Sequence, residues 1–296
     1  MKQLLTILLA AAAASSLHAA PLDPARVPAD AKWWLHLDLE GARQSEVGGR
    51  IAREITEREG AKLRAAERMF SINPLTDLAG FTLYGDGDEK NGVLIVEGRF
   101  DQAHLTDIVA AADDYATSEH AGTTVHSWKD KSKSQNAAFV GDRLLVFSQT
   151  KSTLHDAIDL LASGEGMQAE TFATVGAPPV FIGSAKVAEL PMKKDDAKLL
   201  RKAENLKIAL GETGGQIEGR IELESDSAVT GKLVRKVLEG IVAIGRLTNE
   251  ELADINPAFE TRESEGGRVV SATLSMPASE MISLMEKNGD FDKIGK

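Results

Sequence analysis

The chain has 296 residues, 43% hydrophobic and 27% charged, a balance that predicts a folded globular protein rather than a disordered one. Its net charge of -11, without a local cluster of lysine and arginine, argues against nucleic acid and against an anionic bilayer surface as partners. The sequence contains no cysteine, which excludes disulfides, thiolate nucleophiles and cysteine-ligated zinc.

Residues 1–19 have the pattern of a secretory signal peptide. Lys2 supplies the positive charge, residues 4–14 form an apolar run, and small residues lead to Ala19. The run is too short to cross a bilayer, and Pro21 would end a helix that continued from it. We therefore expect cleavage after Ala19 and a periplasmic or extracellular protein without a membrane segment. An uncleaved anchor is the alternative, whereas a lipoprotein would need a cysteine.

Alternating apolar residues predict strands, and apolar residues spaced three and four apart predict helices. In the first half the predicted elements are a strand at 32–40, a helix at 46–70, a hairpin at 81–100, a helix at 101–113, strands at 123–128 and 137–148, and a helix at 152–162. The second half repeats this order with a strand at 179–187, a helix at 193–203, a hairpin at 205–225, a helix after Asp226 or Ser227, a short helix after Asn249, strands at 258–264 and 268–275, and a helix from Pro277.

The repeated order predicts an internal duplication. We expect an α+β fold of two similar halves, each an antiparallel sheet with helices packed on one face, loosely ferredoxin-like. The predicted boundaries are a first domain at 22–164, a linker at 165–178 and a second domain at 179–296. The sequence leaves open whether the halves form separate sheets or one continuous sheet.

Three segments carry a family resemblance: the opening VPADAKWWLHLDL, the GVLIVEGRFD step into a helix, and AFVGDRLLVFSQTKSTLHDAIDLL. They are similar to large exported bacterial proteins of the DUF3352 type. The resemblance covers most of the chain after residue 19 and implies an envelope protein without known catalytic residues. It therefore transfers no site residue to this sequence.

Two short motifs suggest chemistry only weakly. The acidic loop 86–92 is similar to a calcium loop, but Lys90 and Asn91 stand where a ligand and a glycine are needed, so we interpret it as a hairpin turn. Ser148 and Lys151 match S-x-x-K, but the companion motifs are missing or out of order. We therefore predict no catalytic, cofactor-binding or metal-binding residue, and no cofactor.

The histidines after residue 19 lack the spacing of a metal site on a helix. His120 and His126 flank the turn at Gly122 and can approach each other across a hairpin, but no acid is placed to complete a site. We interpret all five as isolated residues: His36, His104, His120, His126 and His155.

One pattern indicates a contact surface. Trp34 and His36 alternate away from the leucines of their strand, and His126 and Trp128 repeat the pair on a later strand. If helices cover the leucine face, these four residues form a patch on the uncovered face, where exposed tryptophan marks a contact. The alternative is that the other half or the long helix covers them.

The sequence therefore favours a non-enzymatic binding, scaffold or assembly role in the cell envelope, with another envelope protein or a second copy as partner. One alternative is a carrier or chaperone for an apolar ligand, with a cavity lined by residues such as Leu233, Val237 and Ile241. Another is a hydrolase with an unrecognised Ser/His/Asp site. The sequence identifies neither the ligand nor the oligomeric state.

Overall fold

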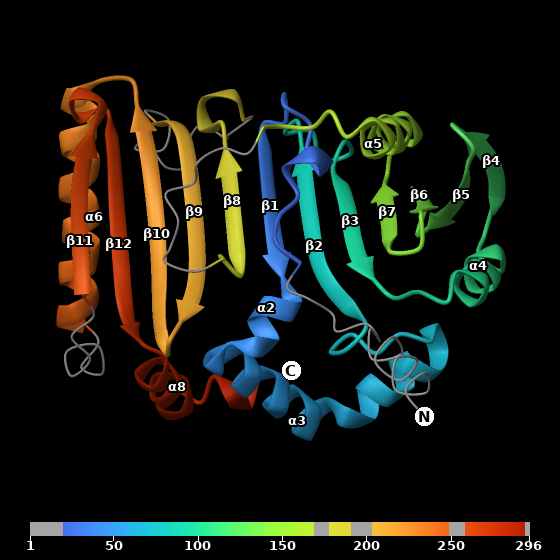
Figure 1. Cartoon of the computed structure of the whole chain (residues 1–296), viewed down its shortest axis with the longest axis horizontal. Coiled ribbons are helices and arrows are strands. Elements are labelled where there is room, and N and C mark those ends of the chain that lie inside the picture. Colours follow the sequence, from blue (N-terminus) through green and yellow to red (C-terminus); the bar gives the residue numbers. More distant parts are fainter. Residues whose placement is uncertain (1–19, 169–177, 191–202, 249–257, 294–296) are drawn as a thin grey trace, which may run out of the picture.

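The fold is an α+β fold built on one antiparallel sheet of twelve strands (Figure 1). The computed structural model describes residues 20–168, 178–190, 203–248 and 258–293. The predicted α+β class and the antiparallel arrangement are both confirmed. The predicted helices at 193–203 and after Asn249 fall largely or wholly outside the described residues, and residue 203 itself begins a strand.

The two halves lie side by side in this sheet and meet at its centre. Outward from the centre, the first half contributes β1 (Trp33–Asp38), β2 (Leu78–Gly85), β3 (Val93–Gly98), β7 (Leu144–Ser148), β6 (Lys133–Val140), β5 (Thr123–Asp130) and β4 (Ala116–His120). The second half contributes β8 (Phe181–Ala185), β9 (Ala203–Thr213), β10 (Gln216–Ser225), β12 (Val269–Pro277) and β11 (Ala258–Ser264).

The pairing of β1 with β8 makes the sheet continuous across the predicted linker. The two strands are antiparallel, with Trp33 opposite Ala185 and Leu37 opposite Phe181. This pairing answers the question that the sequence left open: there is one sheet rather than two. The hydrophobic core also crosses the junction, because Trp34 belongs to the same buried cluster as Ile182 of β8. The division into domains at 22–164 and 179–296 stays a prediction.

Helices connect and cover the strands. The helices of the described residues are α2 (Leu39–Gln44), α3 (Glu46–Phe70), α4 (Gln102–Ala110), α5 (Lys151–Ser163), α6 (Ala228–Thr248) and α8 (Ala278–Lys287), with short 3-10 turns η1 (Pro24–Arg26), η2 (Val187–Glu189), η4 (Glu265–Gly267) and η5 (Phe291–Lys293). The long α3 begins beside α8, where Arg50 pairs with Glu286 at 3.1 Å, and runs away from it along the lower edge of the sheet (Figure 1). No helix of these residues is long and apolar enough to span a membrane.

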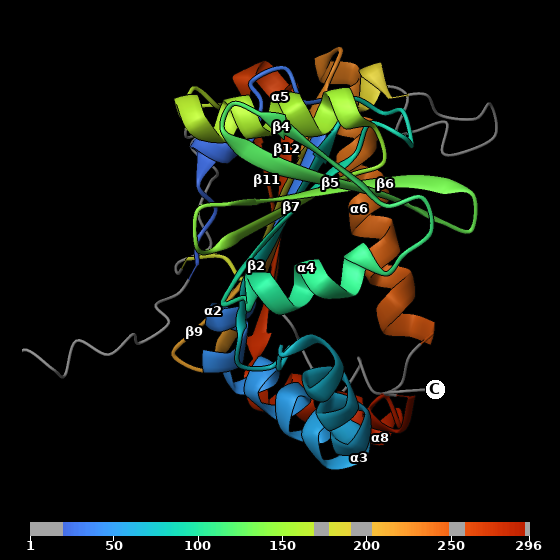
Figure 2. The same ribbon diagram turned by 90° about the vertical axis from the view of Figure 1, so that its right-hand side faces the viewer.

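In the first half, helices lie on both faces of the sheet rather than on the single face that we expected (Figure 2). Val125 of β5 belongs to the core cluster that contains Leu154 and Ile158 of α5. The next residue, His126, points the other way and lines a cavity beneath α4. Because neighbouring residues of a strand face opposite sides, α5 and α4 cover opposite faces of the same strands.

The strand boundaries differ from the prediction at several places; the strand predicted at 32–40, for example, ends at Asp38 because α2 begins at Leu39. The apolar run at 137–148 is two strands, β6 and β7, which turn at Gly141 with a φ of +65°. The edge strand β4 was not predicted because its sequence, ATSEH, is polar and mostly exposed, so it lacks the alternation that identifies a half-buried strand.

Candidate functional site

The structure does not bring the predicted tryptophan–histidine patch together. Residues opposite each other in neighbouring strands share a face. From Trp34 this row runs through Tyr84, Val93, Ser148 and Asn136 to Ser127. Ser127 lies between His126 and Trp128 in β5, so both of those side chains point to the opposite face from Trp34.

Trp34 and His36 are also buried, which corrects the prediction that their face is uncovered. Trp34 is 6% exposed and His36 is 4% exposed. Trp34 packs in the core cluster that contains the α5 residues Leu154 and Ile158. The face of Trp34 was expected to be open because helices were expected on the leucine face of β1. In the first half, however, α5 covers the tryptophan face.

His126 and Trp128 instead line an apolar cavity between α4 and the sheet, with a volume of about 400 Å³. We call it the α4 cavity. All of its lining residues except Thr106 and His126 are apolar. They come from α4, from the end of α3, from the segments that directly follow these two helices, and from β5, β6 and β7. They are Phe70, Ile72, Leu105, Thr106, Ile108, Val109, Ala112, His126, Trp128, Ala137, Phe139, Leu145 and Phe147.

The α4 cavity exists because α4 stands off the sheet. Asp101 caps the helix by accepting a hydrogen bond from the His104 N–H at 3.0 Å, and none of the nine residues of α4 is buried. On the other face, α5 buries Leu154, Ala157 and Ile158 almost completely. The apolar side of α4 therefore meets the aromatic side chains of the strands without closing on them.

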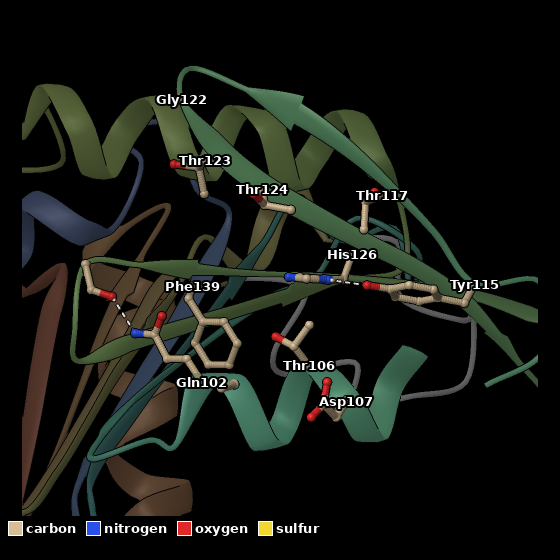
Figure 3. A pocket seen from close by; sticks show the side chains of 12 residues that line it. Gln102, Thr106, Asp107, Tyr115, Thr117, Gly122, Thr123, Thr124, His126 and Phe139 are labelled. Atoms are coloured by element: carbon tan, nitrogen blue, oxygen red, sulfur yellow. Dashed lines mark hydrogen bonds between the residues drawn. The ribbon is translucent and has the colours of Figure 1, made fainter. Parts of the chain in front are cut away.

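A polar pocket adjoins the α4 cavity (Figure 3). It has a volume of about 750 Å³, and three residues line both spaces: Thr106, His126 and Phe139. Its other lining residues are mostly polar or small: Gln102, Ala103, Asp107, Tyr115, Thr117, Gly122, Thr123, Thr124 and Gly141. The side chains of Thr106 and Asp107 point from α4 toward the strands (Figure 3). An apolar space and a hydrogen-bonding space thus meet at His126.

His126 is held in place at this junction. Its Nδ1 lies 2.9 Å from the Tyr115 hydroxyl, and the two rings are stacked with centroids 6.1 Å apart. Burial lowers the pKa of His126 below its ordinary value of 6.5, so the ring is neutral at pH 7. A neutral imidazole has one donor and one acceptor nitrogen. With Nδ1 used by Tyr115, Nε2 is the nitrogen left for a ligand.

The two weak motifs have structural roles. In the loop at 86–92, Asp86 accepts the Asp88 N–H at 2.8 Å and the Asn91 side-chain amide at 2.9 Å, as a hairpin turn requires. In the S-x-x-K motif, α5 begins at Lys151 rather than at Ser148. Ser148 therefore does not have Lys151 one helical turn away. Within the described ranges, no cluster of three or more histidine, cysteine or acidic residues is placed to hold a metal ion.

The histidines are less isolated than predicted. His120 does not approach His126; it stacks on His155 of α5, and its Nε2 lies 2.8 Å from Asp159. His36 binds Thr82 and the carbonyl of Ala20, and His104 lies 2.9 Å from the carbonyl of Met69. Among the described residues, none of these hydrogen bonds joins a histidine to a serine.

Sequence reasoning missed the α4 side of the cavity. The apolar positions of the helix, such as Leu105, Ile108 and Val109, have the spacing of an ordinary core helix. The available signal was on the strands, where Trp128, Phe139 and Phe147 place large aromatic side chains opposite one short helix. The residues suggested for a carrier cavity do not form one in the described part of the chain: Leu233 is 50% exposed and Val237 is 39% exposed.

Comparison with known proteins gives a likeness of fold. No family model matches the chain, and none of the curated proteins matches it. Among solved structures, crystal form III of TP0453 matches with a TM-score of 0.50 and 10% identity, over 91% of this chain and 99% of that chain. Crystal form IV of the same protein gives a TM-score of 0.48 with 10% identity, over 90% of this chain and 97% of that chain. The resemblance to DUF3352-type proteins stays a prediction.

Proposed function

We propose that this chain is a non-enzymatic binding protein of the cell envelope that carries an amphipathic small molecule in the α4 cavity. The observation that carries this proposal is the cavity itself. Its volume of about 400 Å³ lies within the range of small-molecule pockets, roughly 300–1,000 Å³. Such pockets are mainly apolar with a few polar groups that orient the ligand, and Thr106 and His126 are the polar groups here.

The shape of the site favours a ligand with two chemically different ends. An apolar chain fits between α4 and the aromatic residues of the strands, where burial of apolar surface contributes about 25 cal/mol per Å². A polar head fits in the polar pocket, within reach of His126 and Thr106. Because the His126 ring is neutral, the head of the ligand needs to offer it a hydrogen bond and not an opposite charge.

The proposal is tested with a fluorescent apolar probe, N-phenyl-1-naphthylamine, titrated into the purified protein. Ala112 lines the α4 cavity and is half-buried, so Ala112→Phe fills part of the space. Ala110, the last residue of α4 and two positions before Ala112, is exposed and lines neither space, so Ala110→Phe is the matched control. We expect Ala112→Phe to weaken probe binding at least about tenfold, equivalent to about 1.4 kcal/mol, and Ala110→Phe to leave it unchanged.

Two results would contradict the proposal. One is the absence of saturable probe binding to the wild-type protein. The other is equal binding by the Ala112→Phe and Ala110→Phe variants when both have the circular dichroism spectrum of the wild type. In the second case the probe binds at a surface other than the α4 cavity.

A scaffold or assembly role is the second candidate, and a different observation favours it. Leu210 of β9 and Leu274 of β12 lie on either side of Gly219 of β10 in register, and they are 41% and 39% exposed. Ile208, also on β9, is 37% exposed. Exposed apolar side chains gathered on a sheet mark contact surfaces. Leu210→Asp should then lower the molar mass measured by light scattering if the protein self-associates through this surface.

We also propose export and duplication. The sequence pattern of residues 1–19 supports export, and cleavage after Ala19 would place the protein in the periplasm or outside the cell. The strand order supports duplication, because β1-β2-β3-β7-β6 and β8-β9-β10-β12-β11 run outward from the same central pair. In addition, α4 follows β3 and α6 follows β10 in the chain.

A further inference from the structure

Both main-chain polar groups of Ala20 form hydrogen bonds with buried side chains. Its main-chain N–H donates to Asp38 Oδ1 at 3.1 Å, and its carbonyl oxygen lies 2.7 Å from His36 Nε2. All three residues are buried: Ala20 is 7% exposed, His36 is 4% exposed and Asp38 is 2% exposed. The start of the described chain is therefore fixed inside the protein rather than lying on its surface.

The arrangement of polar atoms around Ala20 is specific. A carbonyl oxygen only accepts, so His36 Nε2 carries the proton that it donates to Ala20. The Thr82 hydroxyl, 2.9 Å from Nδ1, then donates to the other ring nitrogen. A side chain at Gly80 would meet the Leu37 carbonyl at 2.9 Å and the His36 ring at 3.4 Å. Gly80 thus leaves the room in which His36 and Ala20 fit.

Asp38 is a buried carboxylate with two main-chain donors. Its Oδ1 accepts from Ala20 and, at 2.8 Å, from the Gly41 N–H, where it caps α2. Among the described residues, no lysine, arginine or histidine forms an ion pair with it. Burying a charge is costly unless an opposite charge is near, so the site has the chemistry of a receptor for a single cation beside Oδ1.

We propose that Ala20 is the first residue of the mature chain and that its α-ammonium group forms a buried ion pair with Asp38. A protease of the export pathway adds water across the Ala19–Ala20 peptide bond. The C–N bond breaks, Ala19 keeps the new carboxylate, and the amine of Ala20 takes up a proton at neutral pH. The Ala20 nitrogen, which already donates to Asp38, thereby carries the positive charge. Cleavage would then add an ion pair to this buried site and stabilise it. The inference depends on the proposed export and not on ligand binding.

Cleavage before Ala20 and cleavage after Ala20 have different consequences for the buried hydrogen bonds. Cleavage after Ala20 would remove the donor to Asp38 and the carbonyl that His36 binds, and would leave two buried polar groups without their partners. Leaving a buried polar group unsatisfied costs about 1–3 kcal/mol. The structure therefore selects the bond before Ala20 over the bond after it.

A double-mutant cycle separates the charge from the hydrogen bond. One chain begins at Ala20 with a free amine, and a second carries Gly-Ser-Gly joined to Ala20, so that the same nitrogen is an uncharged amide. Each is made with Asp38 and with Asp38→Asn, whose Oδ1 still accepts from Ala20 and Gly41. We expect Asp38→Asn to lower the Tm of the free-amine chain by at least about 2 °C more than that of the extended chain.

Equal losses of Tm in the two chains would overturn the ion pair. The cleavage site is tested separately by mass spectrometry of the exported protein, and a mature N-terminus other than Ala20 would overturn it. If neither chain with Asp38→Asn folds, the reactivity of the Ala20 amine decides instead. The Ala20 amine of the folded free-amine chain should react with an N-hydroxysuccinimide ester at pH 7 at least about tenfold more slowly than in the chain unfolded by urea, since an ion-paired amine is a poor nucleophile. Equal rates would contradict the proposal.

Discussion

The imidazole rings of His120 and His155 lie parallel, with their centroids 4.0 Å apart and their planes inclined by 6°. His120 comes from the edge strand β4 and His155 from α5, so the stack joins the outer hairpin to the helix on that face. Asp159 lies 2.8 Å from His120 Nε2, whereas the buried Nε2 of His155 has no hydrogen-bond partner among the described residues. A proton on His155 would therefore face His120 and Lys151 without an acceptor.

The first prediction is a loss of stability on acidification. Burial, followed by the neighbouring His120 and Lys151, lowers the pKa of His155 below 6.5, and burial also lowers the pKa values of His36 and His126. Below pH 6.5 the unfolded chain then binds more protons than the folded chain, so the free energy of unfolding falls as the pH falls. Tm measured from pH 7.5 to pH 5 should decrease, and His155→Gln should reduce the slope. An unchanged slope in this variant would exclude His155 as a contributor.

The second prediction separates two tryptophans that the sequence placed together. Trp34→Ala removes a side chain that is 6% exposed in the main core and should cost about 3–5 kcal/mol of unfolding free energy. Trp128→Ala opens the wall of a space that already exists and should cost less, because fewer contacts are lost. Urea denaturation followed by circular dichroism measures both. Equal costs would contradict the assignment of the two residues to different environments.

The third prediction uses two glycines of α6. A side chain at Gly231 would collide with the Gly267 carbonyl, so Gly231→Ala must push α6 away from η4 and should destabilise the protein by about 1–3 kcal/mol. Among the described residues, nothing lies within 4 Å of a side chain at Gly240, so Gly240→Ala should stabilise the protein by about 0.5–1 kcal/mol. Thermal unfolding of both variants tests the packing of α6 against η4. The reverse order of Tm values would show that α6 lies elsewhere.

Most of the elements could be predicted because the residues that determine each one, its caps and its apolar spacing, lie in or beside the segment itself. The helix predicted at 46–70 is α3 with the same bounds, since its Ser45 cap and its apolar spacing are both contained in the segment. The hairpin predicted at 205–225 forms from β9 and β10, whose turn uses Gly214 and Gly215 at positive φ. The pairing of β1 with β8 was not predictable in this way, because it joins residues about 150 positions apart.

The candidate site could not be predicted because it depends on which face each helix covers. Alternation in β1 and β5 correctly separated Trp34 from Leu35 and His126 from Val125. It did not indicate that α5 would cover the face of Trp34 while α4 covers the face of Trp128. That choice is made by packing between distant segments, and the stand-off of α4 that forms the cavity is a result of the same packing.

The most direct test of the proposed carrier function is quenching of Trp128 by a brominated acyl chain. Bromine quenches tryptophan on contact, and Trp128 lines the α4 cavity whereas Trp33 and Trp34 lie on β1. We expect 12-bromododecanoate to quench the wild-type emission saturably and to quench Trp128→Phe much less, while both proteins bind the probe N-phenyl-1-naphthylamine. The absence of saturable quenching in the wild type, or equal quenching of the two proteins, would contradict binding of an apolar chain in the α4 cavity.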